Sequence, residues 1–369
     1  MNFRKPLPAL LALVSLISAN TPVRACTGGA LIAKDGGVAV GRTLEFGQPL
    51  DSVLAVWPAG SEFTGITSTG ANGLKWKSKY GLLGPTVATF HDQLFDGIND
   101  QGLNAGIFYF PGFAQYAEPT PENTAKGISP GQIVTWILSN CANVAEVKEK
   151  INDVAMLPVV LSVIGIVPDL HVKVQDPTGA CITLEPRGGK LVVYDNPARV
   201  LTNAPEFPWH LTNLNTYLTV TADYPEGKKV GDLKLAPFGM GAGAFGLPGD
   251  FSPPARFVRM AFFLQNAEPQ ESSGQAVATM FHFLNNFDIP PGSALPPAGV
   301  SETYPDYTSW TIVADLAKNQ YHWKTFGNQN VRMVDLAQAL KAAGDKKVTV
   351  EMGPQDRGTF TPSTIIEAK

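Results

Sequence analysis

The sequence has few cysteines, few charged residues and no long hydrophobic segment. Only Cys26, Cys141 and Cys181 are present, without a C-x-x-C pair, and the five histidines lack the H-E-x-x-H spacing, so we expect no metal ion. An odd number of cysteines leaves at least one thiol free. Charged residues make up 16% of the 369 positions, with 28 lysines and arginines against 32 aspartates and glutamates. This balance argues against nucleic-acid binding and against a polybasic membrane anchor.

The amino-terminal segment is apolar but too short to span a membrane. It begins with Arg4 and Lys5, continues through an apolar run over residues 7–17, and ends in Val23-Arg24-Ala25. This pattern predicts a secretory signal peptide over residues 1–25, and an uncleaved anchor helix is the less favoured alternative. We therefore expect an exported bacterial protein, periplasmic or secreted, that is soluble after removal of the signal. Removal of this segment would take away three basic residues, so the mature chain would have 25 lysines and arginines and 32 acidic residues.

Cleavage after Ala25 would make Cys26 the first residue of a mature chain that we expect to be one domain over residues 26–369. A terminal cysteine combines a thiol nucleophile with an α-amine that is substantially neutral near about pH 7.5, so the amine can act as its general base. The alternative is lipid attachment at Cys26, which would make the chain a lipid-anchored protein that binds acyl compounds. Arg24 weighs against that alternative, because lipid-attachment sites usually have small residues at this position.

Hydrophobic periodicity predicts two groups of strands with helices between and after them. The predicted strands cover residues 26–33, 38–44, 53–57, 102–110, 170–174, 181–185, 190–194, 310–316, 321–326 and 331–334. The predicted helices cover residues 129–139, 144–151, 254–265, 274–286 and 333–343. This order favours an α+β fold in which two antiparallel sheets pack together and are covered by helices.

Two other segments carry patterns associated with function. Residues 287–307 are rich in proline and predict a long loop, either functional or a plain surface crossover. Residues 241–246 match G-x-G-x-x-G, but no helix follows and no βαβ strand precedes, so we reject dinucleotide binding.

Four short motifs carry a family resemblance. They are Cys26-Thr-Gly-Gly, Gly41-Arg42-Thr43-Leu44-Glu45-Phe46, Leu201-Thr202-Asn203-Ala204-Pro205 and Arg256-Phe257-Val258-Arg259. Their order and spacing resemble the choloylglycine hydrolase family, which contains penicillin V acylases and conjugated bile salt hydrolases. The resemblance extends from Cys26 to the segments around residues 310–336.

The resemblance implies an N-terminal-nucleophile hydrolase with an αββα sandwich, assembled as a homotetramer and using no cofactor. By position, Cys26 is similar to the family's nucleophile and Arg42 to the arginine beside its sulfur. Asn203 is similar to the oxyanion-hole side chain, and Arg256 to the second active-site arginine. Tyr109 falls where the family supplies an oxyanion backbone N–H; bile salt hydrolases usually carry asparagine there and penicillin V acylases often tyrosine.

Glu45 departs from the family pattern, which has aspartate at this position. Its carboxylate is one methylene longer and can still accept a hydrogen bond from the Cys26 amine. The alternative is a plain strand carboxylate paired with Arg42. For Asn203 the alternative is an Asx turn before Pro205, and for Arg256 an ion pair on the helix surface near Asp250.

These residues together predict hydrolysis of a small linear amide with an apolar acyl group. We expect the arginines to lower the thiol pKa, and the Asn203 amide and the Tyr109 N–H to hold the developing oxyanion. Aromatic residues around Tyr109 (Phe108, Phe110 and Phe113) suggest an aromatic acyl pocket, unless they alternate into the core. We therefore rank penicillin V first, conjugated bile salts second and N-acyl homoserine lactones third as substrates.

Overall fold

The fold is taken from a computed structural model that describes residues 25–47, 50–87, 89, 92–161, 165–295 and 305–353. Most of the predicted signal peptide, residues 1–24, lies outside the described residues. So do residues 296–304 of the predicted proline-rich loop.

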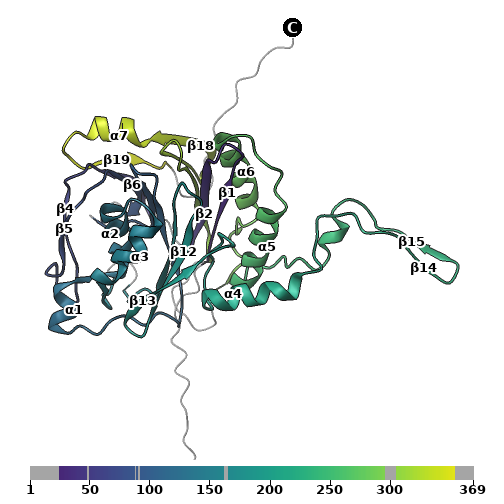
Figure 1. The fold of residues 1–369 in the computed structure, drawn as a ribbon, viewed down its shortest axis with the longest axis horizontal. Helices are drawn as coiled ribbons and strands as arrows, with labels where there is room; N and C mark the ends of the chain where they lie inside the picture. Colours follow the sequence, from purple (N-terminus) through teal and green to yellow (C-terminus); the bar gives the residue numbers. More distant parts are fainter. Residues whose placement is uncertain are drawn as a thin grey trace, which may run out of the picture.

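Two antiparallel sheets form the centre of the molecule (Figure 1). The five-stranded sheet has the order β1 (Cys26–Ile32), β2 (Val38–Phe46), β16 (Tyr307–Asp315), β17 (Gln320–Thr325) and β18 (Asn328–Asp335). The eight-stranded sheet has the order β13 (Lys190–Asp195), β12 (Cys181–Arg187), β11 (Leu170–Gln175), β8 (Asn104–Tyr109), β7 (Asp96–Asn99), β6 (Leu82–Val87), β3 (Ser52–Trp57) and β19 (Val348–Glu351).

Helices cover the outer face of each sheet, which gives four layers (Figure 1). Helices α5 (Pro253–Gln265) and α6 (Ser273–Asn285) pack against β1, β2 and β16. On the other side, α2 (Ile133–Asn140) packs against β6, β7 and β8, and α3 (Val144–Lys150) follows it. Helix α7 (Leu336–Ala343) contacts β18 of one sheet and β3 of the other. The predicted sandwich of two helix-covered antiparallel sheets is confirmed.

Smaller elements complete the chain. They are β4 (Glu62–Thr64), β5 (Lys75–Lys77), α1 (Pro121–Ala125), β9 (Gly127–Ile128), η1 (Pro130–Gln132), η2 (Ile151–Asp153), β10 (Ala155–Met156), α4 (Phe207–Asn213), η3 (Leu214–Tyr217), β14 (Lys228–Val230), β15 (Leu233–Leu235) and η4 (Ala242–Ala244). The hairpin β14–β15 extends away from the layered body (Figure 1). We call residues 221–245 the arm.

Most predicted elements are found, but one helix prediction needs correction. The helix predicted over residues 333–343 begins at Leu336, because the three preceding residues extend β18. The two helices predicted over residues 129–139 and 144–151 are found: η1 and α2 end at Asn140, and the Asn143 side chain caps the start of α3. The sequence also gave no signal for β6 and β7, which are buried on both faces and therefore do not alternate.

Close contact between β2 and α6 depends on Gly41. A Cβ atom at Gly41 would lie 2.7 Å from Leu284 Cδ1 and 2.8 Å from Met280 Cγ, so a side chain here would have to displace these two side chains of α6. This packing is part of the main apolar cluster, which contains Cys26. A second cluster lies around α2, against the eight-stranded sheet.

Candidate active site

Cys26 begins β1, the edge strand of the five-stranded sheet, and its side chain is buried. In the β1–β2 register Cys26 faces Leu44 and Gly28 faces Arg42, so Arg42 lies one diagonal step from Cys26 on the same face. Arg42 Nη2 donates to Cys26 Sγ at 3.0 Å. The hairpin predicted from the sequence therefore brings the cysteine and the first arginine together.

Backbone carbonyls and an aromatic ring hold the Arg42 guanidinium in place. Its Nη1 donates to Phe95 O at 3.2 Å and also to Ile107 O, and its Nε donates to Thr43 O at 3.2 Å. The Phe108 ring lies 4.3 Å from Arg42 Cζ. With its other donors occupied in this way, Nη2 is directed at the sulfur.

Burial decides the protonation of the Cys26 thiol. Loss of solvent raises its pKa, and the charge of Arg42 opposes this effect without overcoming it. Both arginines act to lower the thiol pKa, as expected, but in this state of the chain the effect of burial is larger and the net shift is upward. Here the Cys26 nitrogen is a peptide nitrogen joined to Ala25.

Asn203 lies beside Cys26 because its segment pairs with β1. Gly28 N donates to Leu201 O at 2.8 Å, and Leu201 N donates to Gly28 O at 3.1 Å. Asn203 Oδ1 accepts from Cys26 N at 3.0 Å, and its Nδ2 donates to Tyr109 O at 2.7 Å. The side chain is thus committed to Cys26 and Tyr109 rather than to an Asx turn.

Arg256 reaches the same place from α5. Its Nη2 donates to Asn203 Oδ1 at 2.6 Å, and its Nη1 donates to Thr27 Oγ1 at 2.8 Å and to Cys26 O. Burial lowers its pKa to about 10, so it stays charged at neutral pH. The alternative of a surface ion pair with Asp250 does not hold, since Arg256 is buried.

Tyr109, the last residue of β8, contributes its backbone from the opposite sheet. A hydrogen bond from the Tyr109 backbone favours the Cys26 thiolate and partly offsets the effect of burial on its pKa. The Tyr109 side chain packs in the cluster around α2, whereas Phe108 on the other face packs in the cluster of Cys26. Phe110 stacks on His171 with ring centroids 4.3 Å apart. Of these three aromatics, only Phe108 shares the cluster of Cys26, so strand alternation takes the Tyr109 ring elsewhere.

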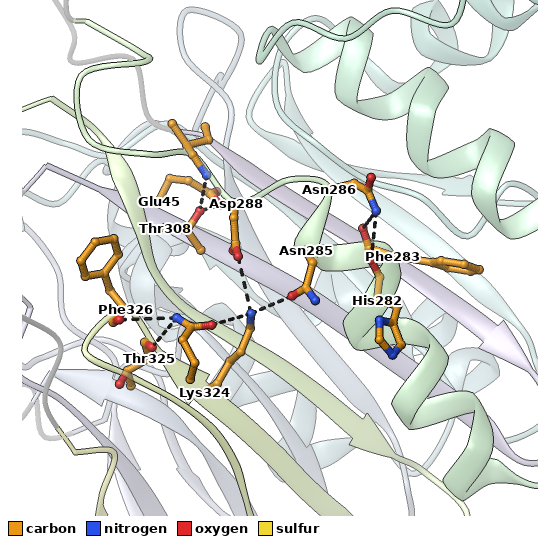
Figure 2. Close-up of polar contacts among 12 residues, drawn as sticks. Glu45, His282, Phe283, Asn285, Asn286, Asp288, Thr308, Lys324, Thr325 and Phe326 are labelled. Atoms are coloured by element: carbon orange, nitrogen blue, oxygen red, sulfur yellow. Dashed lines mark hydrogen bonds and ion pairs between the residues drawn. The ribbon is translucent and has the colours of Figure 1, made fainter. Parts of the chain in front are cut away.

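Glu45 is buried on β2, and its Oε1 accepts from Thr308 Oγ1 at 2.9 Å (Figure 2). Burial raises the pKa of this carboxyl to about 7, and the charge of Arg256 is the strongest opposing influence. The hydrogen bond predicted from the Cys26 amine stays a prediction, because the Cys26 nitrogen here is a peptide nitrogen whose one hydrogen is donated to Asn203 Oδ1. The alternative was an ion pair between Glu45 and Arg42, but Oε1 is bonded to Thr308 instead.

Three further buried residues near the site were not predicted. Asp96 Oδ1 accepts from Asn104 Nδ2 and from Tyr321 Oη, each at 3.0 Å, and burial raises its pKa to about 6 while Arg42 opposes this. His171 Nε2 lies 3.2 Å from Thr202 O, and His210 Nε2 lies 3.0 Å from Asn203 O. In the sequence, each of these three residues is a single acid or histidine within an apolar stretch. That signal is too weak to assign a role.

All three cysteines are buried free thiols, as expected for at least one of them. Among the residues described, no group of three or more His, Cys, Asp and Glu side chains is arranged to hold a metal ion. The same part of the chain contains no helix long and apolar enough to cross a membrane. Residues 241–246 include the short turn η4 in the arm rather than a strand-to-helix junction.

The site surrounds one thiol with two guanidinium groups, a carboxyl, a side-chain amide and a backbone N–H, which suits acyl transfer from an amide. An αββα sandwich with a cysteine at the start of an edge strand defines the class of N-terminal-nucleophile hydrolases. Comparison with known proteins gives the family within that class. The model for "Linear amide C-N hydrolases, choloylglycine hydrolase family" matches residues 26–347. The chain belongs to this family and is a hydrolase of linear amides.

Relatives within the family differ in substrate. A bile salt hydrolase/transferase of Clostridium perfringens is 31% identical over 84% of this chain and 92% of its own length. A penicillin V acylase of Pectobacterium atrosepticum is 25% identical over 88% of this chain and 86% of its own length. The crystal structure of a variant of conjugated bile acid hydrolase from C. perfringens superposes with a TM-score of 0.79 at 29% identity, covering 92% of this chain and all of that one. The comparisons establish the family of this chain, and the relatives named here act on different substrates.

Proposed function

We propose that Cys26, once its α-amine is free, hydrolyses small linear amides through an acyl-thioester. The observation that carries this proposal is the placement of Cys26 Sγ, 3.0 Å from Arg42 Nη2 and hydrogen-bonded to the Tyr109 backbone. The free amine takes the thiol proton, and the sulfur adds to the amide carbonyl carbon. The protonated amine then donates its proton to the departing nitrogen as the C–N bond breaks. The amine next takes a proton from water, whose oxygen attacks the thioester carbonyl carbon. The C–S bond breaks, the acid leaves, and the ammonium returns its proton to the Cys26 thiolate.

The oxyanion formed in both steps needs donors close to the sulfur. The Tyr109 N–H is one, and the Asn203 amide is the other, since Nδ2 has two hydrogens and Tyr109 O takes one of them. Arg256 keeps Asn203 in this orientation by holding Oδ1. Glu45 supplies the negative charge next to the cationic amine.

This chemistry requires removal of the residues before Cys26. We propose that residues 1–25 act as an export signal and that the mature enzyme is periplasmic or secreted. The support is the charged start, the apolar run over residues 7–17 and Ala25 at the expected cleavage position.

We propose penicillin V as the first substrate to test, because the motif around Tyr109 resembles penicillin V acylases. Conjugated bile salts are the second candidate, favoured by the 31% identity with the clostridial bile salt hydrolase/transferase. Long-chain acyl homoserine lactones rank third. Initial rates on penicillin V, glycocholate, taurocholate and these lactones decide between them. A rate on glycocholate a hundredfold above that on penicillin V would reverse the order without changing the mechanism.

We also propose that the enzyme is a homotetramer in which the arm contacts other copies of the chain. The support is apolar side chains exposed on the arm, among them Tyr224, Val230, Leu233, Phe238, Met240 and Phe245. Such side chains on a projecting hairpin are expected where another surface covers them.

The test of the nucleophile is Cys26→Ser, with Cys181→Ser as the matched control. Both thiols are buried, but Cys181 lies in β12 on the other sheet. We expect exported wild-type protein to begin at Cys26 and to gain the acyl mass on that residue, Cys26→Ser to lose turnover, and Cys181→Ser to keep it. Full activity of Cys26→Ser would refute the proposal. A diacylglyceryl mass on Cys26 would support the lipid-anchored binding protein instead.

A further inference from the structure

Thr308 connects Glu45 to the segment that follows α6 (Figure 2). Its Oγ1 donates to Glu45 Oε1 at 2.9 Å and accepts from Ile289 N at 2.9 Å. Thr308 N in turn donates to Ile289 O at 3.2 Å. Thr308 and Ile289 are therefore joined by two hydrogen bonds, which leave the hydroxyl little freedom to rotate.

The local strand geometry aims this hydroxyl at the carboxyl. Thr308 faces Glu45 in the β2–β16 register, and the register shifts between Thr308 and Trp310, so one extra residue is accommodated there. A bulge of this kind redirects side chains at the end of a ladder. Thr308 and Glu45 are both buried, so water does not replace the bond between them.

Lys324 and its polar partners fix the segment that contains Ile289. Lys324 of β17 donates from Nζ to Asn285 Oδ1 at 2.7 Å and to Gln329 Oε1 at 2.9 Å, and its Nζ lies 3.5 Å from Asp288 Oδ2 (Figure 2). Asp288 directly precedes Ile289. The end of α6 and the Ile289 amide are thus tied to β17.

The direction of these bonds determines which Glu45 oxygen can carry a proton. A hydroxyl has one hydrogen, and the Ile289 N–H already occupies an acceptor position on Thr308 Oγ1. The remaining hydrogen points at Oε1, so Oε1 must be an acceptor. Glu45 Oε2 is buried and has no hydrogen-bond partner in the structure, so it is the oxygen left to hold a proton.

We propose that Thr308 is a positioning residue that fixes the Glu45 carboxyl with Oε1 as acceptor and leaves Oε2 to serve the Cys26 amine. This inference rests on the proposed function, in which Glu45 carries the charge next to that amine. The groups that face Glu45 are Arg256 from α5, Arg42 and Thr43 from β2, and Thr308 from β16. The Thr43 side chain also hydrogen-bonds to this carboxyl, but Thr43 lies on the same strand as Glu45. Thr308 donates to Oε1 and connects the carboxyl to Ile289, outside the sheet.

The experiment compares Thr308→Val, which is nearly isosteric but lacks the hydroxyl, with Thr308→Ser, which keeps it. Loss of a donor to the carboxylate disfavours ionisation, so the acid limb of the kcat–pH profile should move upward by about one pH unit in Thr308→Val. Thr308→Ser should keep the wild-type limb, and kcat should fall more than KM rises in Thr308→Val. Thr308→Ala, measured alongside, removes the hydroxyl without a branched side chain and covers the case that Thr308→Val fails to fold.

Two controls make the result specific. Thr183→Val removes a buried hydroxyl of β12 that accepts a hydrogen bond from Asn196, and it should leave the kcat–pH profile unchanged. In a Glu45→Gln background, Thr308→Val should shift nothing further. An acid limb at the wild-type pH in both Thr308→Val and Thr308→Ala overturns the inference. Full activity of Cys26→Ser would instead refute the proposed function, so the two failures are distinguishable.

Discussion

At the scale of single residues, the Asn203 side chain links three parts of the site. Its two polar atoms contact the backbones of Cys26 and Tyr109 and the guanidinium of Arg256. Such a side chain can hold the site together and also donate to an oxyanion. Kinetics separate these functions, because an oxyanion donor acts mainly in the transition state.

We expect Asn203→Ala to lower kcat by about a hundredfold or more with little change in KM, the usual effect of losing one oxyanion donor. Steady-state kinetics on the best substrate of the panel measure both parameters. A rise in KM at unchanged kcat would place Asn203 in substrate binding instead.

Buried carboxyls also set how stability depends on pH. The folded-state pKa of Glu45 is raised to about 7 and that of Asp96 to about 6, both by burial. Each group binds its proton more tightly in the folded state than in the unfolded chain. Their contribution to stability is therefore complete below the unfolded-state pKa of about 4 and is lost as the pH rises towards about 7.

Glu45→Gln should remove part of this loss. Above about pH 8 we expect the free energy of unfolding of the variant to exceed that of the wild type by at most about 3 kcal/mol. Near about pH 4 we expect no such difference. Urea titrations at both pH values measure the difference. Glu226→Gln, at an exposed position of the arm, is the control and should match the wild type at both. Equal stability of Glu45→Gln and wild type at high pH would contradict the expectation.

At the scale of elements, the segment that carries Asn203 is held by two buried histidines. A carbonyl oxygen only accepts, so Nε2 of His171 and of His210 must each carry the hydrogen that bonds to Thr202 O and Asn203 O. The His210 ring stacks on Phe257 of α5 with centroids 4.6 Å apart, next to Arg256 in sequence. Burial lowers the His210 pKa to about 4, so the ring is neutral at neutral pH.

His210→Phe keeps the ring stack and removes the hydrogen bond to Asn203 O. We expect a loss of about 1–2 kcal/mol in the free energy of unfolding and a lower kcat, because the Asn203 segment loses one of its fixed points. Thermal unfolding and kinetics measure the two effects. The exposed His282→Phe is the control. Unchanged kcat in His210→Phe would show that the backbone pairing with β1 holds Asn203 by itself.

At the scale of the whole molecule, the arm is the feature that the layered body does not explain. Thr221 N donates to Gly243 O at 3.1 Å and closes its base, beyond which most residues are exposed. An exposed apolar hairpin of this kind costs solubility unless another surface covers it. The proposed tetramer provides such a surface.

We expect the double variant Phe238→Asp/Phe245→Asp to form smaller assemblies than the tetramer proposed for the wild type, because charge in a buried contact is unfavourable. Size-exclusion chromatography with light scattering measures the mass. Val331→Asp, an exposed apolar position on β18 away from the arm, should keep the wild-type mass. A wild-type protein that is already monomeric would rule out this role for the arm.

The sequence alone determined the class of fold, and its family resemblance predicted the nucleophile and most of the candidate site. Cys26 and Arg42 lie on one hairpin, so their proximity follows from local strand pairing. Asn203, Arg256 and the Tyr109 backbone were assigned by resemblance to family motifs, and the structure places all of them around Cys26.

Tertiary structure decided everything that depends on contacts between distant segments. Thr308 and Glu45 are separated by 263 positions, and Asp96 and Tyr321 by 225, so no local pattern relates them. The net shift of the thiol pKa was not predictable for the same reason: the sequence shows which charges are near, but only packing shows how much solvent is lost. Strand alternation took the Tyr109 ring away from Cys26, while its backbone stayed at the site. Side chains far apart in sequence acquire a common environment only when the two sheets pack together, and that environment determines their chemistry.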